Sequence, residues 1–582
     1  MLWANYRQNA NGQPTVSVPA PVDRETPDVP WWYDYIAQHA NLWAKVGFTD
    51  ILFPNPLICQ GGSGPGDDGY NPFDDYDIGS KGAPTRFGTA EKLRRAVAIC
   101  RANGLKVWID IVNHQRMGGS NGTYLYRSAT GQTNGRFAKR PSYFRGSPPR
   151  VPEDPVPAPS DDFPFGDELC PINAIPKGEV WNGLIAAANW LFLTTGTQGA
   201  RLDDMKGMNV EFVHAWMTSR SMPSLEFFGE YDDGNPNNEN WWIDQVQQRA
   251  SALDFAFQEN MVYPMCMKAG GVEGWQMSWM GKNALLFRNP MKAVTFVSSL
   301  DSETDGWATI VNNKTLGLAL MLGMMGLPMV YIKDWLPKSM NGYALNEEIE
   351  NLVWCSRNLA NGDVDIVYSD AKTYVFQRTG PPGALIALNN DVWNPNWTTV
   401  TCPVQHLPGT VMHDYTGKNQ QDSIVDAKRT ITFGIPPAAN GNGYGFWAPA
   451  GWDDDITFPK LPCTQSFFGA EDLDIGPATN GTMTVGRVWI EKHSPIETEL
   501  TVSTTGWIPE TSRVAFQIYG PDYRQHGGTA TYAEPRVQAS SRAVATGWHE
   551  IALTSSALPR EGAPFTLKIE YTAPQTIGPE EF

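Results

Sequence analysis

The chain has 582 residues, 41% of them apolar, which is enough for several domains that each bury a core. Its formal net charge of −18 excludes nucleic acid and anionic membranes as expected partners, because a surface of this sign repels both. Aromatic residues make up 12% of the chain and include 22 Trp, so exposed rings that could stack on sugar faces are expected besides those in the core.

Short apolar segments alternate with amphipathic helical patterns from the first residues to about residue 360. The predicted strands are 2–6, 49–54, 106–112, 200–203, 225–230, 253–257, 293–297 and 328–332. The predicted helices are 31–46, 89–103, 181–195, 210–219, 241–249, 315–325 and 347–359. Strands that alternate with helices favour parallel pairing through crossovers, and eight strands close a barrel. The predicted fold class is therefore α/β, with a (β/α)8 TIM barrel.

Residues 115–177 form a segment too long for an ordinary strand-to-helix loop, and it is rich in Pro, Gly, Ser and Asp. We therefore predict an inserted domain over the C-terminal face of the barrel. Short alternating strands further along predict an antiparallel β-sandwich, a linker and a second β-rich unit. The predicted domains are the barrel at 1–114 and 178–361, the insert at 115–177, the sandwich at 362–450, the linker at 451–462 and the C-terminal β-sandwich at 463–582.

The uncharged run 315–332 has the length of a candidate membrane span. Three glycines and Pro328 divide it, so we expect a buried helix followed by a strand and no contact with a membrane.

The seven cysteines form neither a CxxC pair nor a dense disulfide pattern, so thiols predict no metal site. Cys59 and Cys170 are the one pair considered for a disulfide bond. The first residues lack a basic segment followed by an apolar one, and no signal peptide is predicted in this chain. A mature secreted or periplasmic protein is the expected setting, with a cytoplasmic one as the alternative.

Three acidic residues stand at the ends of predicted strands: Asp203, Glu230 and Asp301. Side chains alternate along a strand, so Arg201 and Asp203 point the same way, and the cation is expected to keep this carboxylate ionised. Cleavage of a glycosidic bond needs one carboxylic acid to protonate the leaving oxygen and one carboxylate to attack or stabilise the sugar cation. The three acids together therefore predict a glycoside-cleaving site.

Four ordered segments around these residues resemble the signature regions of the α-amylase family, glycoside hydrolase family 13. They are 106–115, 199–207, 228–233 and 296–301, and the stretch 69–77 resembles the segment before the family's second barrel helix. The resemblance covers most of residues 1–450. It implies a retaining enzyme in which Asp203 is the nucleophile, Glu230 the general acid/base and Asp301 the stabiliser of the transition state. The implied substrate-binding residues are Arg201, Tyr70, His114, Gln115 and Lys206.

The chain departs from the family pattern at the residues that would hold the sugar. Aligned without a gap, His114 stands where the family has Asn and Gln115 where it has His, whereas a one-residue deletion matches Asn113 and His114. Leu300 and Gly207 stand where the family usually or frequently has His. The family's Asn also helps to hold a structural calcium ion, so the resemblance makes calcium an expectation, with Asp167 and His114 as candidate ligands.

The leading hypothesis is an enzyme that cleaves α-1,4-glucosidic bonds in starch-like glucans or maltooligosaccharides. An α-glucanotransferase of the same family would share the three acids and differ in how its acceptor site excludes water, so it remains an alternative. A non-catalytic glucan-binding homologue is the alternative from another class. At the C-terminus, Trp489, Trp507 and Trp548 are either a glucan-binding platform of a carbohydrate-binding module or part of a sandwich core.

Overall fold

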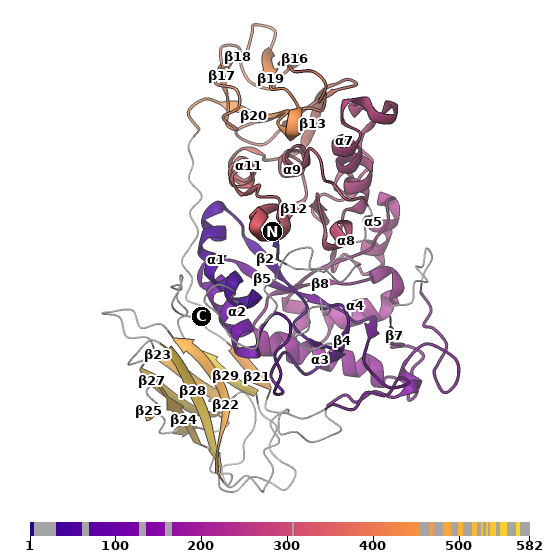
Figure 1. Cartoon of the computed structure of the whole chain (residues 1–582), viewed down its shortest axis with the longest axis vertical. Coiled ribbons are helices and arrows are strands. Elements are labelled where there is room, and N and C mark those ends of the chain that lie inside the picture. The colour runs from indigo at the N-terminus through magenta and orange to yellow at the C-terminus, as the bar shows by residue number, and fades with distance from the viewer. Residues whose placement is uncertain are drawn as a thin grey trace.

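The computed structural model describes residues 1–4, 31–60, 69–126, 136–156, 166–304, 308–340, 342–452 and, beyond residue 465, separate segments between 466 and 570. Its centre is a closed barrel of strands in the order β1-β12-β11-β10-β9-β8-β5-β2, with helices around it (Figure 1). The barrel strands are β1 (Leu2–Trp3), β2 (Asp50–Phe53), β5 (Lys106–Ile111), β8 (Gly199–Leu202), β9 (Glu226–Gly229), β10 (Ser251–Leu253), β11 (Ala293–Phe296) and β12 (Leu327–Tyr331). All of their pairings are parallel, so the predicted (β/α)8 barrel is confirmed.

Each predicted helix overlaps an observed one. The larger helices of the barrel are α1 (Trp32–Val46), α2 (Ala90–Ala102), α3 (Glu179–Thr195), α4 (Val210–Thr218), α5 (Pro236–Gln245), α9 (Lys314–Gly323) and α11 (Asn346–Leu359). Thr89 caps α2 as expected, because its side chain accepts a hydrogen bond from the Lys92 N–H at 3.4 Å. The shorter helices are α6 (Phe255–Phe257), α7 (Tyr263–Met267), α8 (Leu300–Thr304) and α10 (Ile332–Trp335).

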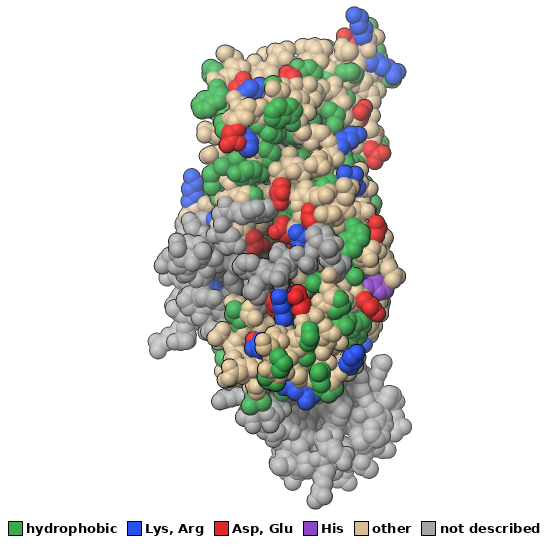
Figure 2. Space-filling view, turned by 90° about the vertical axis from the view of Figure 1, so that its right-hand side faces the viewer, with side chains coloured by type: hydrophobic (Ala, Val, Ile, Leu, Met, Phe, Trp, Pro, Cys, Tyr) green, Lys and Arg blue, Asp and Glu red, His purple; other side chains and the backbone are tan. Residues whose placement is uncertain are grey.

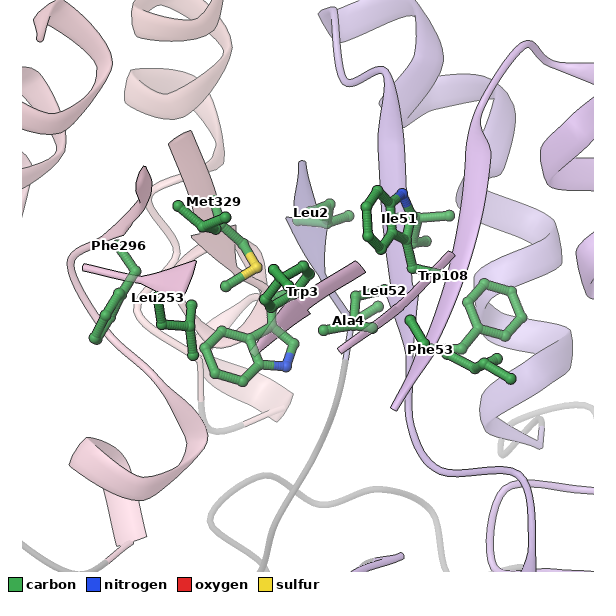
Figure 3. Close-up of a cluster of buried hydrophobic side chains, with 14 of the residues drawn as sticks. Leu2, Trp3, Ala4, Ile51, Leu52, Phe53, Trp108, Leu253, Phe296 and Met329 are labelled. Carbon is green, nitrogen blue, oxygen red and sulfur yellow. The ribbon is translucent and has the colours of Figure 1, made fainter. Parts of the chain in front are cut away.

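Apolar side chains fill the inside of the barrel. Trp3 is fully buried on β1 and lies among Leu52, Leu253 and Met329, which come from three other barrel strands (Figure 3). The outer helices bury the opposite faces of the same strands, so most strand residues are buried on both sides.

The predicted strand 253–257 is wrong beyond its first residue. β10 ends at Leu253, and Asp254 is the N-cap residue of α6. The Asp254 carboxylate accepts hydrogen bonds from the backbone N–H groups of Phe257 at 2.8 Å, Leu285 at 3.0 Å and Leu286 at 2.8 Å. A buried aspartate that caps a helix and also binds the next segment stops the strand despite the apolar residues that follow.

The predicted insert lies between β5 and α3. Its described elements are β6 (Gln115–Arg116), which pairs with β7 (Asp167–Glu168), and the short helix η1 (Pro141–Tyr143). The loop before α2 carries a second hairpin, β3 (Ile58–Cys59) with β4 (Pro72–Asp74).

A buried ion cluster joins the insert to that loop. Arg116 and Lys139 of the insert both contact the Asp75 carboxylate, and all three side chains are at most 3% exposed. The Lys139 ammonium also donates to the Tyr126 hydroxyl at 2.9 Å. Burial alone would raise the pKa of Asp75, but the two cations hold it well below its usual range.

Antiparallel sheets follow the barrel. One sheet has the order β13-β14-β15-β20-β17-β18 and a second pairs β16 with β19. Their strands are β13 (Val364–Ser369), β14 (Thr373–Arg378), β15 (Leu385–Asn389), β16 (Thr398–Pro403), β17 (Val411–Asp414), β18 (Ser423–Ile424), β19 (Thr430–Ile435) and β20 (Tyr444–Pro449). Buried residues of both sheets, such as Val375, Leu385, Val400, Ile431 and Trp447, share one core. The domain boundaries themselves stay a prediction.

A further antiparallel sheet lies towards the C-terminus and has the order β21-β29-β23-β27-β25-β24-β28-β22, with β26 beside β27. Its strands are β21 (Ser466–Gly469), β22 (Gly481–Ile490), β23 (Glu499–Thr504), β24 (Ala515–Tyr519), β25 (Gln525–Gly527), β26 (Thr531–Ala533), β27 (Arg536–Arg542), β28 (Gly547–Ser555) and β29 (Thr566–Glu570). Trp489 and Trp548 are cross-strand partners in β22 and β28, whereas Trp507 and most of the predicted linker lie outside the described residues.

Two remaining expectations concern membranes and thiols. Within the described residues, no helix has the length and apolar character needed to cross a membrane, and the run 315–332 forms α9 and β12. Cys59 and Cys170 are buried and not bonded to each other, so the disulfide considered between them is wrong.

We expect Asp75→Asn to lower the free energy of unfolding at pH 7 by about 3–5 kcal/mol, because it leaves two buried cations without their anion. The Asp75 pKa is lowered by folding, so its contribution is present above the unfolded pKa of about 4 and is lost as pH falls. Urea unfolding at pH 7 and at pH 3 would measure both effects. The exposed Asp365→Asn is the control, with an expected change within about 0.5 kcal/mol. Equal stability of Asp75→Asn and the parent chain at pH 7 would contradict the role of this cluster.

Candidate active site

The side chain of Arg201 is the centre of a buried group at the C-terminal end of the barrel. It is 0% exposed and projects from β8 between two aromatic rings. Its Cζ lies 5.5 Å from the ring centroid of Trp3 and 5.7 Å from that of Tyr70. These distances are within the range of cation–π contacts, so the rings fix the plane of the guanidinium.

Three carboxylates bind this one guanidinium. Nη1 donates to both oxygens of Asp110 at 2.8 Å and to Oδ1 of Asp203 at 2.9 Å, and Nη2 lies 2.6 Å from Oε2 of Glu230. The contact between Arg201 and Asp203 agrees with the predicted alternation along the strand. Asp110 is the residue that the sequence reasoning missed: it lies in the first signature segment, and the register of β5 with β8 places it directly beside Arg201.

The turn after β8 binds the end of β9. The Asp204 N–H donates to Glu230 Oε2 at 3.1 Å, and the Met205 N–H donates to the Glu230 carbonyl at 2.9 Å. Asp204 adopts a left-handed conformation with φ of 48°, which is uncommon for a residue other than glycine. Backbone strain of this kind occurs at functional sites, and here it turns an N–H towards a predicted catalytic carboxylate.

The charges in this group do not balance. Burial raises the pKa of Asp203 well above its usual value, and the neighbouring carboxylates of Glu230 and Asp110 add to this, while Arg201 lowers it. The same burial raises the pKa of Asp110. This direction runs against the expectation that Arg201 keeps Asp203 ionised. Three carboxylates thus share one guanidinium, and the crowding of negative charge acts with burial to raise the pKa of Asp203.

Asp301 follows the seventh barrel strand and lies near enough to Tyr70 for its charge to act on it. It lies on α8, which follows β11, and its charge is among those that raise the pKa of Tyr70, after burial and Asp110. Leu300 before it is 1% exposed and belongs to the core, so it faces away from the solvent where the family has a histidine.

A buried ion network anchors the helix that carries Asp301. Glu303, also on α8, accepts hydrogen bonds from Lys314 at 2.8 Å, from Lys333 at 2.7 Å and from the Tyr343 hydroxyl at 2.9 Å. Lys314 also donates to Asp334 at 2.8 Å. The Glu303 side chain is 1% exposed. Lys314 and Lys333 stand directly before and after the uncharged run 315–332. Nothing else in the sequence indicates that they bind a carboxylate on α8.

The predicted substrate-binding residues lie close to this group. The Tyr70 hydroxyl donates to Asp110 at 2.6 Å, and the Gln115 side-chain amide donates to the Tyr70 carbonyl at 3.0 Å. Lys206 lies 3.6 Å from Asp233, beyond the end of β9. Acidic side chains gather around basic ones near the middle of the molecular face shown in Figure 2.

His114 and Gly207, two of the unusual positions, are structurally linked. His114 Nδ1 lies 3.0 Å from Asp204 Oδ2. A Cβ atom at position 207 would lie 2.9 Å from His114 Nε2 and 2.9 Å from Asp204 Oδ2. Burial lowers the pKa of His114, but the hydrogen bond and charge of Asp204 and the charge of Glu168 raise it overall. The His114–Asp204 pair thus occupies the space that a side chain at position 207 would need.

Asp167 and His114 do not fit a calcium site. The Asp167 carboxylate is bound by the Arg150 guanidinium at 2.6 Å and by the Tyr124 hydroxyl at 2.9 Å. Calcium binds oxygen ligands, and His114 offers none from its side chain. The described part of the chain holds no cluster of three or more His, Cys, Asp or Glu side chains arranged for a metal ion. Calcium held by other residues stays a prediction.

A cavity of about 570 Å³ lies at the opposite end of the barrel, where Asp50, Lys106 and Glu226 begin their strands. Barrel enzymes carry their active sites at the C-terminal ends of the strands. The acidic group around Arg201, and not this cavity, is therefore the candidate active site.

Comparison with known proteins agrees with this site. No protein-family model matches the chain. The chain is similar to an alpha-amylase of Geobacillus stearothermophilus, with 25% identity over 490 residues that cover 73% of this chain and 85% of that protein. It is also similar to a glucan 1,4-alpha-maltohexaosidase of Bacillus sp. (strain 707), with 23% identity over 479 residues that cover 72% of this chain and 89% of that protein.

Among solved structures, a Gamma-CGTase from the alkalophilic Bacillus clarkii has the same fold, with a TM-score of 0.54 and 15% identity. The match covers 92% of this chain and 90% of that one. The curated relatives, the barrel and the four signature segments agree with one another. The chain is therefore similar to members of the α-amylase family in its curated relatives and in its barrel, and it is an enzyme of the glycoside hydrolase class.

Proposed function

We propose that the protein is a retaining α-glycosidase that cleaves α-1,4-glucosidic bonds in starch-like glucans or maltooligosaccharides. The observation that supports this most is the contact of Asp203 and Glu230 with the two ends of one guanidinium. Retaining glycosidases keep their two carboxyl groups about 5–5.5 Å apart, closer than enzymes that place a water between them. The names of the similar alpha-amylase and maltohexaosidase support a glucan substrate.

In the proposed first step, Asp203 attacks the anomeric carbon while Glu230 gives a proton to the leaving oxygen. The carbon–oxygen bond of the glucan breaks, and an ester bond to Asp203 forms. Glu230 would supply this proton as the general acid, and Arg201 can stabilise the ionised Asp203. In the second step, Glu230 takes a proton from water, and the resulting hydroxide equivalent displaces Asp203. Asp301 and Tyr70 would hold the sugar in the cleaved subsite.

Transfer to another sugar is the alternative outcome of the second step. An acceptor hydroxyl can replace the water without any change in the carboxylates, and the fold is shared with a Gamma-CGTase. A non-catalytic glucan-binding role is disfavoured. Burying Arg201 with three carboxylates carries a desolvation cost, and a protein that only binds glucan does not require such a group.

We expect Asp203→Asn to lower turnover of soluble starch and maltooligosaccharides by roughly 10⁴-fold or more, because an amide cannot form the glycosyl ester. Release of reducing ends would measure this, and circular dichroism would check the fold. Asp365→Asn is the matched control and should turn over like the parent chain. Undiminished turnover by Asp203→Asn would refute the proposed nucleophile.

Products resolved over time should distinguish hydrolysis from transfer. With maltoheptaose as the only substrate, we expect shorter chains with a rising number of reducing ends, because water is the proposed acceptor. Chromatography of the products would measure chain length. Products longer than maltoheptaose, or cyclic ones, would instead assign the protein as a glucanotransferase.

We expect Tyr343→Phe to lower kcat for maltoheptaose by roughly tenfold and leave KM within about twofold. The loss of its hydrogen bond to Glu303 loosens the helix that positions Asp301, and small displacements of catalytic groups have large effects on rate. Tyr368→Phe is the control, since its hydroxyl bonds an exposed Asp370 on the β-sandwich. A loss of thermal stability without a change in kcat would show a purely structural role for Tyr343.

A further inference from the structure

Trp393 is an indole on the surface of the β-sandwich, in the loop between β15 and β16. Its side chain is 73% exposed, although burying a ring of this size is favourable. It belongs neither to the acidic group around Arg201 nor to the described cores. The exposure of this indole therefore makes it a candidate for ligand binding, and the residues around it indicate which ligand would fit.

The chain holds this indole in a fixed position. A Cβ atom at Gly270, in the helix η5 (Ala269–Gly274), would lie 2.2 Å from Nε1 and 2.4 Å from Cδ1 of Trp393, so the ring rests directly on a glycine backbone. The Gly270 N–H donates to the Asn390 carbonyl at 2.7 Å and ties the two loops together. One edge of the ring is thus supported while most of its surface faces the solvent.

Hydrogen-bonding groups flank the ring. A Cβ atom at Gly271 would lie 3.1 Å from the Lys372 ammonium, so this cation lies against the residue that follows the supporting Gly270. Lys372 is 3.8 Å from Asp391, and both side chains are about a third exposed or less. An apolar ring beside a donor and an acceptor matches a pyranose, which has an apolar face of C–H groups and a rim of hydroxyls.

A second exposed indole is positioned by the same turn. Trp279 is 61% exposed and ends the helix η6 (Met277–Trp279). The Met277 N–H donates to the Ala371 carbonyl at 3.1 Å, and the Ser278 N–H donates to the Asp370 carbonyl at 2.9 Å. The turn that carries Lys372 therefore also carries the helix of Trp279. Two indoles along one seam suit an extended ligand.

The surroundings favour a sugar chain over a protein partner. The core of a protein interface is a continuous apolar area, whereas the exposed residues beside these rings alternate between apolar ones, Val272 and Trp397, and polar ones, Glu273, Gln276 and Asn396. The net charge of −18 also disfavours a polyanion.

We propose that Trp393, Lys372, Asp391 and Trp279 form a second glucan-binding site on the seam between the barrel and the β-sandwich, which binds a linear segment of neutral α-glucan. The identity of the ligand rests on the proposed function, but binding here requires no catalysis. The site would hold a polymeric substrate to the protein while another segment is cleaved at the acidic group.

The test is affinity electrophoresis of the full chain in gels that contain soluble starch. We expect Trp393→Ala to weaken starch binding by at least about fivefold and Trp393→Tyr to weaken it less, because an aromatic ring remains. Leu407→Ala removes another exposed apolar side chain, 63% exposed on the same sandwich, and should leave binding unchanged. Turnover of granular starch by Trp393→Ala should fall by a similar factor, while turnover of maltotriose stays within twofold.

The outcomes separate the two proposals. Unchanged starch binding by Trp393→Ala, with normal turnover of short substrates, would overturn the second site and leave the proposed function standing. Starch binding that depends on Trp393, in a chain that cleaves no glucan, would support the site and refute the proposed activity. An equal loss of turnover on maltotriose and on granular starch would also overturn the site, since a surface platform should matter only for long substrates.

Discussion

The contact between one buried guanidinium and three carboxylates is the constraint on which the site depends. Arg201 is fully buried, and taking its charge out of water costs several kcal/mol unless anions compensate. Asp110, Asp203 and Glu230 more than compensate, and they come from three adjacent barrel strands or strand ends. The guanidinium therefore holds the two proposed catalytic carboxylates close to each other, and the surplus of negative charge contributes to the raised pKa of Asp203.

The balance of charge separates this site from the two structural ion clusters. Asp75 is bound by two cations, and Glu303 is bound by two lysines. Their neighbours lower the pKa of both carboxylates in spite of burial, so they stay ionised and hold the structure. At Arg201 the ratio is reversed, and the pKa of Asp203 rises. Each of these two carboxylates has two cations as direct partners, even though Lys314 is shared with Asp334, whereas at Arg201 several carboxylates share one cation, which favours groups that can exchange a proton.

Much of this could be predicted from the sequence, because the period of each strand fixes which side chains share a face. That period predicted the barrel strands and the contact of Arg201 with Asp203. It could not predict that Asp110 lies beside Arg201, since this depends on the register between two strands that are far apart in the sequence. It also placed a strand through Asp254, whose buried side-chain hydrogen bonds start a helix. Contacts between distant segments, such as Lys314 with Glu303, have no local signal.

The departures from the family pattern fall at positions expected to bind the sugar, and not at the three carboxylates proposed for catalysis. Gly207 leaves room for the His114–Asp204 pair, and Asp204 in turn directs its N–H to Glu230. Leu300 packs in the core. The same helix, α8, is also anchored by the hydrogen bonds that Glu303 accepts from Lys314 and Lys333. The contacts that hold Asp203 and Glu230 at Arg201 therefore do not depend on the positions where the chain departs from the family pattern.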